Sequence, residues 1–244
     1  MDMYTNLKRA TLFGLSMAMG GSIGVSAEPI KTFSAVLPPF SIGEPDMPGI
    51  THELLLEISE RTDLEFDFEY LPFIRMNAEI QKTPNSLAFT VLRSPAREDM
   101  FNWIVEVIVT NEVFATTSAA INTTDEAIAL KSVTTLEGSP RAKRLTAAGL
   151  TNLKPATDPA TSATLLNKGR VEAWYTFDHR ARYLTKAQGF DPATIVTGAP
   201  IVEAPLWLAS NTTFDPEIAA QLKASIEELK ADGTYGKIVS KYTE

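Results

Sequence analysis

The chain has 244 residues, a formal net charge of −8 at pH 7 and no cysteine. The absence of cysteine excludes a disulfide framework, a thiolate nucleophile and a cysteine metal site. The acidic balance argues against nucleic acid as a partner, and the length suffices for one large domain or two small ones.

The N-terminus predicts a secretory signal peptide over residues 1–27. Lys8 and Arg9 form a short basic region, and an uncharged, largely apolar stretch follows over residues 10–23. Small residues then end at Ala27, as at a cleavage site. The stretch is too short and too rich in glycine for a membrane-spanning helix. We therefore expect export to the periplasm and cleavage after Ala27.

Strands and helices alternate through the first half of the mature chain. A short apolar strand is expected at residues 33–37, a helix at 51–62, and a strand at 65–71 with one buried face near a sheet edge. One or two helical turns follow at residues 75–82, and then a strand at 87–92. This alternation predicts an α/β fold with parallel-rich sheets.

The second half repeats the alternation. A loop and helix are expected at residues 138–150, a short helix at 163–168 and a strand at 171–175. Residues 201–209 are apolar, and Asp215 is a suitable N-cap with Pro216 at the first helical position. The following helix has an apolar stripe formed by Ile218, Leu222, Ile226 and Leu229. Because no single linker divides the chain, two lobes joined by crossing strands fit this pattern.

The most distinctive stretch covers residues 90–103, with the sequence TVLRSPAREDMFNW. A strand ends in a Ser-Pro turn, and Arg97 begins the segment that follows. Exposed backbone amides, a hydroxyl and a guanidinium fork together suit a carboxylate, because the fork can pair with both oxygens. The order of strand, Ser-Pro, arginine, acidic residue and phenylalanine resembles the core signature of the family 3 periplasmic solute-binding proteins, which are the receptors of amino-acid-type ABC importers.

Other stretches resemble the same family in the same order, so the resemblance covers nearly all of residues 32–244. These stretches are residues 37–40 with 49–50, 72–75, 167–173 and 229–242. The resemblance implies the two-lobed periplasmic-binding-protein fold of type II, an α/β fold with flanking helices and two crossing strands. It also implies that residues 28–110 and 203–244 form lobe 1 and that residues 111–202 form lobe 2.

The resemblance implies a ligand site between the lobes. Arg97 is expected to clamp a carboxylate, although it could instead pair at the surface with Glu98 or Asp99. Thr90 matches the hydroxyl position beside that arginine, and an ordinary strand residue is the alternative. Gly138 and Ser139 match a loop that meets the carboxylate with backbone amides at a helix N-terminus.

Four further residues complete the predicted site. Phe40 and Phe73 are expected to form an apolar or stacking wall, with core packing as the alternative. Arg75 lies in a proline turn and could make a second anionic contact, or it could be a solvated residue at a helix start. Asp178 follows the strand at residues 171–175, where a carboxylate could meet a cationic group.

The sequence departs from the family pattern at several positions of the ligand site, including the one that holds the ligand's amino group. Phe177 lies where typical amino-acid receptors of the family carry the acidic residue that holds the α-ammonium, and Asp178 comes one position later. Leu92 and Pro140 replace hydroxyl residues, and Leu37 replaces an aromatic one. We therefore expect a small carboxylate-bearing solute, either an amino acid held in an altered geometry or a related organic acid.

The sequence favours a binding protein over an enzyme. It predicts no cofactor and no metal site, because the two histidines, His52 and His179, lie far apart and show no metal-ligand spacing. We expect a monomer that delivers its ligand to an ABC permease in the inner membrane. The alternatives are a sensor domain without transport and a periplasmic enzyme resembling the cyclohexadienyl dehydratases, for which Glu203, or Asp178 with His179, would supply the acid and base.

Overall fold

The fold is seen in a computed structural model that describes residues 28–244. The predicted signal peptide at residues 1–27 lies outside this range. Among the described residues, no helix is both long and apolar enough to span a bilayer.

The first lobe is built on a five-stranded sheet with the strand order β2-β1-β3-β10-β4. Its strands are β1 (Ile30–Ser34), β2 (Phe66–Tyr70), β3 (Leu87–Leu92), β4 (Asn102–Ile108) and β10 (Leu206–Ser210). β1 pairs in parallel with β2 and β3, whereas β10 runs antiparallel to β3 and β4. β2 is an edge strand, as its alternating sequence predicted.

β1 lies three residues earlier than the sequence predicted. It covers residues 30–34 in place of the expected 33–37. The parallel register begins with Ile30 opposite Phe66. The chain then leaves the sheet before Pro38 and Pro39, which have no backbone N–H to donate to a ladder.

The second lobe is built on a sheet with the order β6-β7-β5-β8, and β9 also pairs with β5. Its strands are β5 (Asn111–Thr116), β6 (Val133–Thr134), β7 (Ala173–Phe177), β8 (Val196–Thr197) and β9 (Val202–Glu203). Its helices are α3 (Thr124–Ile128), α4 (Pro140–Ala147), α5 (Pro159–Asn167), α6 (Asp178–Ala187) and the 3-10 helix η2 (Pro192–Thr194). All five residues of β7 are buried, because helices cover both faces of this sheet.

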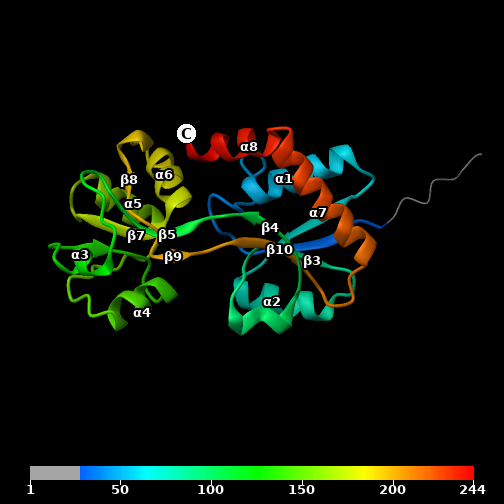
Figure 1. Ribbon diagram of the computed structural model, residues 1–244, viewed down its shortest axis with the longest axis horizontal. Coiled ribbons are helices and arrows are strands. Elements are labelled where there is room, and N and C mark those ends of the chain that lie inside the picture. Colours follow the sequence, from blue (N-terminus) through cyan, green and yellow to red (C-terminus); the bar gives the residue numbers. More distant parts are fainter. Residues whose placement is uncertain (1–27) are drawn as a thin grey trace, which may run out of the picture.

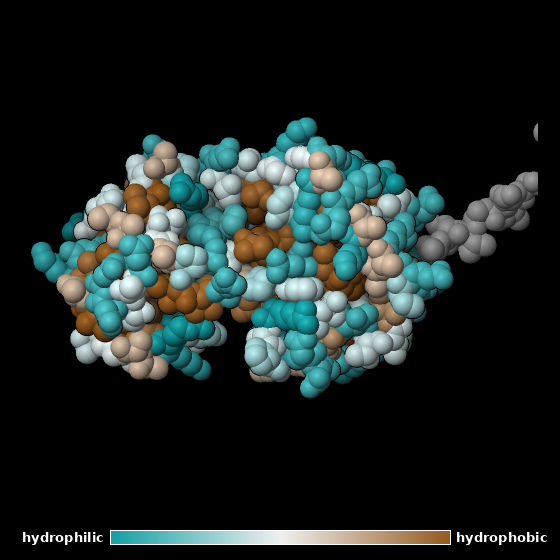
Figure 2. All heavy atoms as spheres, viewed as in Figure 1, coloured by the Kyte–Doolittle hydropathy of each residue, from teal (hydrophilic) through white to brown (hydrophobic). Residues whose placement is uncertain are grey.

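Two connections cross between the lobes (Figure 1). One runs from β4 into β5 through residues 109–110, and the other runs from β9 into β10 through residues 204–205. Figure 2 shows the surface hollowed between the two lobes, on the side where α2 and α4 lie. The predicted two-lobed α/β fold is therefore confirmed, and the lobe boundaries at residues 110/111 and 202/203 stay a prediction.

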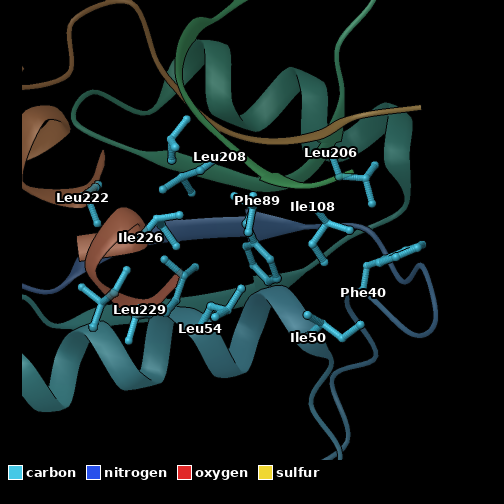
Figure 3. Close-up of a cluster of buried hydrophobic side chains, with 14 of the residues drawn as sticks. Phe40, Ile50, Leu54, Phe89, Ile108, Leu206, Leu208, Leu222, Ile226 and Leu229 are labelled. Atoms are coloured by element: carbon cyan, nitrogen blue, oxygen red, sulfur yellow. The ribbon is translucent and has the colours of Figure 1, made fainter. Parts of the chain in front are cut away.

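Helices cover both faces of the first sheet. They are α1 (Ile50–Arg61), α2 (Phe73–Lys82), α7 (Pro216–Ala231), α8 (Thr234–Thr243) and the 3-10 helix η1 (Pro95–Met100). The larger core lies between the sheet and helices α1 and α7, where Leu54 and Ile226 meet Phe89 and Leu208 (Figure 3). The opposite face packs on α2 through Met76 and Ile80.

The start and the buried face of α7 agree with the sequence prediction. The carboxylate of Asp215 accepts hydrogen bonds from the backbone N–H groups of Glu217 (2.7 Å) and Ile218 (3.5 Å). Leu222, Ile226 and Leu229 are buried in the core, and Ile218 packs against its edge. Capping and burial thus select the same helix start and the same inward face.

Helix α8 joins the two lobes on the side away from the hollow (Figure 1). The ring of Tyr242 lies 6.2 Å from that of Tyr183 on α6. The Tyr242 hydroxyl also accepts a hydrogen bond from the backbone of Gly49 (2.9 Å) and donates one to Glu53 (2.5 Å). The space between the lobes is consequently open on one side and bordered by packed helices on the other.

Candidate functional site

A cleft of about 500 Å³ lies between the lobes and is lined by residues of both. The first lobe contributes the segment after β1, the start of α2, the end of β3 and Arg97 of η1. The second lobe contributes residues 136–141 around the start of α4 and Phe177 at the end of β7. Five of the predicted site residues lie in this cleft, namely Phe73, Thr90, Arg97, Gly138 and Ser139.

Thr90 occupies a β-bulge in β3. Val91 pairs with Trp207 and Ala88 pairs with Ala209, so Phe89 and Thr90 together oppose the single residue between them. Thr90 has a φ of 64°, in the left-handed region that β-branched residues avoid. Its Oγ1 is buried and has no hydrogen-bond partner among the described residues. A bulge with strained backbone at the edge of a cleft is characteristic of a binding position.

Arg97 is half-buried and has no carboxylate partner among residues 28–244. Its Nη1 donates a hydrogen bond to the Leu92 carbonyl oxygen (2.9 Å), and its guanidinium carbon lies 4.6 Å from the centre of the Phe73 ring. Burial lowers the pKa of the Arg97 guanidinium. The expected alternative was a surface pair with Glu98 or Asp99. Glu98 instead binds Arg93, and among residues 28–244 no ion pair joins Arg97 to Asp99.

Gly138 and Ser139 form the start of α4. Gly138 has a φ of 68°, which an L-residue would adopt only with strain. Ser139 is the N-cap, and its Oγ accepts from the Ala142 N–H (3.2 Å) and donates to the Leu136 carbonyl oxygen (2.7 Å). Since this hydroxyl is occupied, the loop would contribute to ligand binding through the free amides and the positive end of the helix.

Arg141 is a cleft residue that the sequence did not single out. Only 9% of its surface is exposed, and its Nη1 lies 3.5 Å from Glu112. Burial lowers the pKa of the Arg141 guanidinium, and Glu112 partly opposes that effect. Glu112 also pairs with Arg144, so one carboxylate serves two arginines. The position of Arg141 in the first turn after a Gly-Ser-Pro loop was the one sequence feature that could have identified it.

Phe177 forms part of the cleft wall, and its ring lies close to the guanidinium groups of two arginines. Its ring centre lies 4.5 Å from the Arg141 guanidinium carbon and 5.0 Å from that of Arg180. Arg180 is buried, and its Nε donates to the Pro38 carbonyl oxygen (2.8 Å). Burial, and then the nearby charge of Arg141, lower the pKa of Arg180 to about 9. This wall therefore favours anions and disfavours an ammonium group.

The structure does not place three of the predicted site residues in the cleft. Phe40 is fully buried in the core, with its ring 6.0 Å from that of Phe177 in an edge-to-face arrangement. Arg75 is exposed on α2, because that helix turns Met76 and Ile80 toward the sheet. Asp178 is the third, and it faces the crossing segment.

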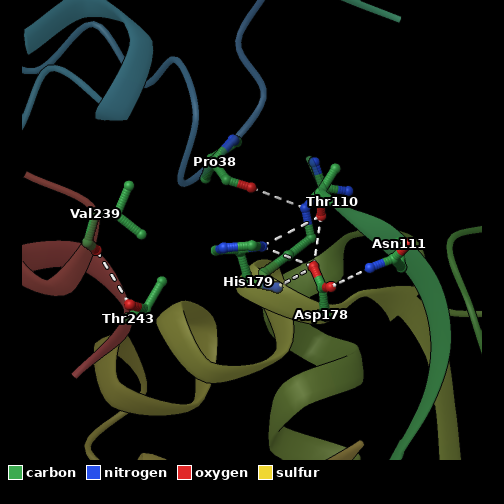
Figure 4. Close-up of polar contacts among 8 residues, drawn as sticks. Pro38, Thr110, Asn111, Asp178, His179, Val239 and Thr243 are labelled. Carbon is green, nitrogen blue, oxygen red and sulfur yellow. Dashed lines mark hydrogen bonds and ion pairs between the residues drawn. The ribbon is translucent and has the colours of Figure 1, made fainter. Parts of the chain in front are cut away.

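Asp178 ties α6 to the crossing segment (Figure 4). Its Oδ1 accepts from the Thr110 hydroxyl (2.5 Å) and pairs with His179 Nδ1 (2.7 Å), while Oδ2 accepts from Asn111 Nδ2 (3.1 Å). Burial raises the pKa of Asp178, but the hydrogen bonds and charge of His179 and the Thr110 hydroxyl outweigh it, leaving a pKa of about 2. The carboxylate already has hydrogen-bond partners and links α6 to the crossing segment.

The residues that would supply acid and base in an enzyme, Asp178, His179 and Glu203, do not line the cleft. Its lining includes one acidic residue, Glu137, which is exposed. Over residues 28–244, no group of three or more His, Asp or Glu side chains is arranged to hold a metal ion.

Comparison with known proteins places the chain in a family. A sequence model described as "Bacterial extracellular solute-binding proteins, family 3" matches residues 32–244. No curated protein matches the sequence.

Solved structures share the fold at low sequence identity. An ancestral cationic amino acid solute-binding protein is 16% identical with a TM-score of 0.74, covering 88% of this chain and 96% of its own. Substrate-binding domain 2 of Lactococcus lactis GlnP in the open conformation is 21% identical with a TM-score of 0.69, covering 89% and 97%. A histidine kinase sensor domain similar to periplasmic binding proteins is 15% identical with a TM-score of 0.66, covering 89% and 96%.

Proposed function

Because the chain belongs to the bacterial extracellular solute-binding proteins, family 3, we propose that it captures a small carboxylate-bearing solute and delivers it to an ABC permease. Arg97 carries this proposal: it lines the cleft, is half-buried and has no carboxylate partner among the described residues. A half-buried guanidinium in the same cleft as the unpartnered hydroxyl of Thr90 favours a carboxylate as its counter-ion.

The mechanism we propose is closure of two lobes around the solute. The cleft draws on both lobes, and two crossing segments connect them. A ligand that touches both sides stabilises the closed form over the open one, and a permease that recognises the closed form would then accept the loaded protein. The cleft is complete within the described part of one chain, which supports a monomeric receptor in the periplasm.

The positions of the acidic residues and of His179 favour a non-catalytic role over an enzymatic one. Asp178 and His179 are hydrogen-bonded to each other outside the cleft, and Glu137, the acidic residue in the lining, is exposed. A general acid of raised pKa would require a buried carboxylate facing the substrate.

A thermal-shift screen tests the proposed ligand class. Plain α-amino acids would be compared with keto, hydroxy and aromatic acids, because a ligand that binds only the folded state raises its melting temperature. We expect stabilisation by acids without an amino group and its loss in Arg97→Ala. Strong stabilisation by several plain α-amino acids, with none by the other acids, would contradict the proposal.

A further inference from the structure

Two arginines, one from each lobe, line the same cleft. Arg97 belongs to η1 of the first lobe and Arg141 to α4 of the second. Neither has a carboxylate of its own among the described residues. Arg97 has a backbone acceptor, and Arg141 shares Glu112 with Arg144.

The contacts of Glu112 show that it uses few of the hydrogen-bond donors of Arg141. Glu112 Oε2 binds Arg144 and accepts a hydrogen bond from the Tyr175 hydroxyl (2.9 Å). Arg141 approaches the other oxygen, Oε1, at 3.5 Å. A charge-assisted hydrogen bond would measure about 2.7–2.9 Å. The Arg141 guanidinium, nine-tenths buried, therefore keeps donors for another anion.

The rest of the lining argues against a cationic group on the ligand. Leu37, Met76, Leu206 and Phe177 give the cleft apolar walls. Glu137, its acidic member, is exposed, so solvent screens its charge. An ammonium inside the cleft would lie near two guanidinium groups and lack a buried counter-ion.

We propose that the natural ligand is a dicarboxylate with an apolar body, one carboxylate bound by Arg97 and the other by Arg141. The assignment of the first carboxylate rests on the proposed function, and the second is new. Because the two arginines lie on different lobes, a diacid would bind both halves at once. The second carboxylate would then favour closure, which a monoacid bound at Arg97 alone would do less effectively.

Matched probes and variants test the second carboxylate. The full chain would be expressed and the protein recovered from the periplasmic fraction. Calorimetry would compare straight-chain dicarboxylates from succinate to suberate with the monocarboxylates of the same carbon number, and terephthalate with benzoate. The variants are Arg141→Gln, Arg97→Gln and, as a matched control, Lys143→Gln, which removes one positive charge from an exposed position on the same helix and does not line the cleft.

We expect at least one diacid to bind about tenfold to a hundredfold more tightly than its matched monoacid. Arg141→Gln should reduce the affinity of that diacid to the level of the monoacid, while Lys143→Gln keeps the difference. Arg97→Gln should weaken both probes.

Three outcomes would overturn the inference. Equal affinities of diacids and monoacids for the parent protein would do so without any variant. Equal losses for both probes in Arg141→Gln would show that Arg141 does not bind a second carboxylate. In both cases monoacid binding at Arg97 would survive, and the proposed function with it. Binding of none of the carboxylates would overturn the inference together with the proposed function.

Discussion

The guanidinium carbon of Arg141 lies 4.5 Å from the centre of the Phe177 ring. An arginine near an aromatic face gains electrostatic stabilisation without being neutralised. Phe177 thus holds a cation in the cleft wall and leaves its charge available. A carboxylate at the same position would instead form an ion pair and remove that charge from the ligand.

Substitution of Phe177 by aspartate tests this relationship. In Phe177→Asp the new carboxylate would lie near Arg141 and Arg180 and would compete with a carboxylate ligand. We expect the affinity for the best acid found in the ligand screen to fall by about tenfold or more, the equivalent of about 1.4 kcal/mol.

The matched control is Phe177→Leu, which keeps an apolar wall and adds no charge. It should retain most of the acid affinity at some cost in stability, because a buried aromatic ring is lost. If both variants lose affinity equally, the ring itself contacts the ligand and charge competition is not the cause.

The positions of Thr90 and Arg97 at the cleft could be predicted from sequence, because the motif that contains them is local. A hydroxyl at the end of a strand, a Ser-Pro turn and an arginine fall within eight residues, so one motif carries them all. Asp215 and the stripe of α7 were predictable for the same reason, since a cap and a helical period act over one element.

Arg141 and Asp178 required the tertiary structure. The role of Arg141 depends on Glu112 and Phe177, which are distant in sequence. Phe177 is the last residue of β7 and Asp178 is the first residue of α6, so their side chains leave the backbone in different directions. Phe177 therefore faces the cleft while Asp178 faces Thr110, a distinction that one residue of register decides. Phe40 was ambiguous from sequence, because a phenylalanine beside a predicted cleft can equally fill the core.

Loss of the Arg97 charge should weaken ligand binding more than replacement of the guanidinium by an ammonium group. Arg97→Ala should weaken binding of a carboxylate ligand by about 2–5 kcal/mol, because a desolvated charge pair is lost. Arg97→Lys should restore the affinity only partly, since an ammonium cannot pair with both carboxylate oxygens through a planar fork. Calorimetry with the same acid measures both values, and an unchanged affinity in Arg97→Ala would locate the carboxylate elsewhere.

Thr90 should show a separation between stability and binding. Relief of a left-handed φ at a non-glycine residue yields about 1–3 kcal/mol. The greater flexibility of glycine in the unfolded chain destabilises the fold by about 0.5–1 kcal/mol. The loss of a buried methyl group destabilises it further. We therefore expect Thr90→Gly to change the free energy of unfolding by no more than about 1 kcal/mol while it weakens acid binding.

Thr32→Gly is the matched control for this substitution. Thr32 is fully buried in β1 and is not among the residues of left-handed φ, so glycine there removes a side chain without relieving strain. Chemical denaturation should give a clearly larger loss for Thr32→Gly than for Thr90→Gly. A comparable loss at both positions would show that the backbone at Thr90 stores little strain, and retained acid affinity in Thr90→Gly would show that its hydroxyl does not bind the ligand.

Asp178 should make the stability of the fold depend on pH in the acid range. Its pKa of about 2 in the folded protein lies below the ordinary value of about 3.9 expected in the unfolded chain. A carboxyl group of lowered pKa stabilises the fold fully above the unfolded value. That contribution, about 2 kcal/mol, is lost as the pH falls toward the folded value. The window for the effect therefore runs from about pH 4 down to about pH 2.

The substitution Asp178→Asn removes this titration and weakens the link to Thr110 and Asn111. We expect Asp178→Asn to be less stable than the parent protein at pH 5, and the difference to shrink steadily as the pH is lowered toward 2. Urea denaturation across this range measures the difference, with Asp46→Asn, at an exposed position, as the control for loss of a carboxylate. A constant difference for Asp178→Asn would mean that the hydrogen bonds of the Asp178 carboxylate do not stabilise the folded protein.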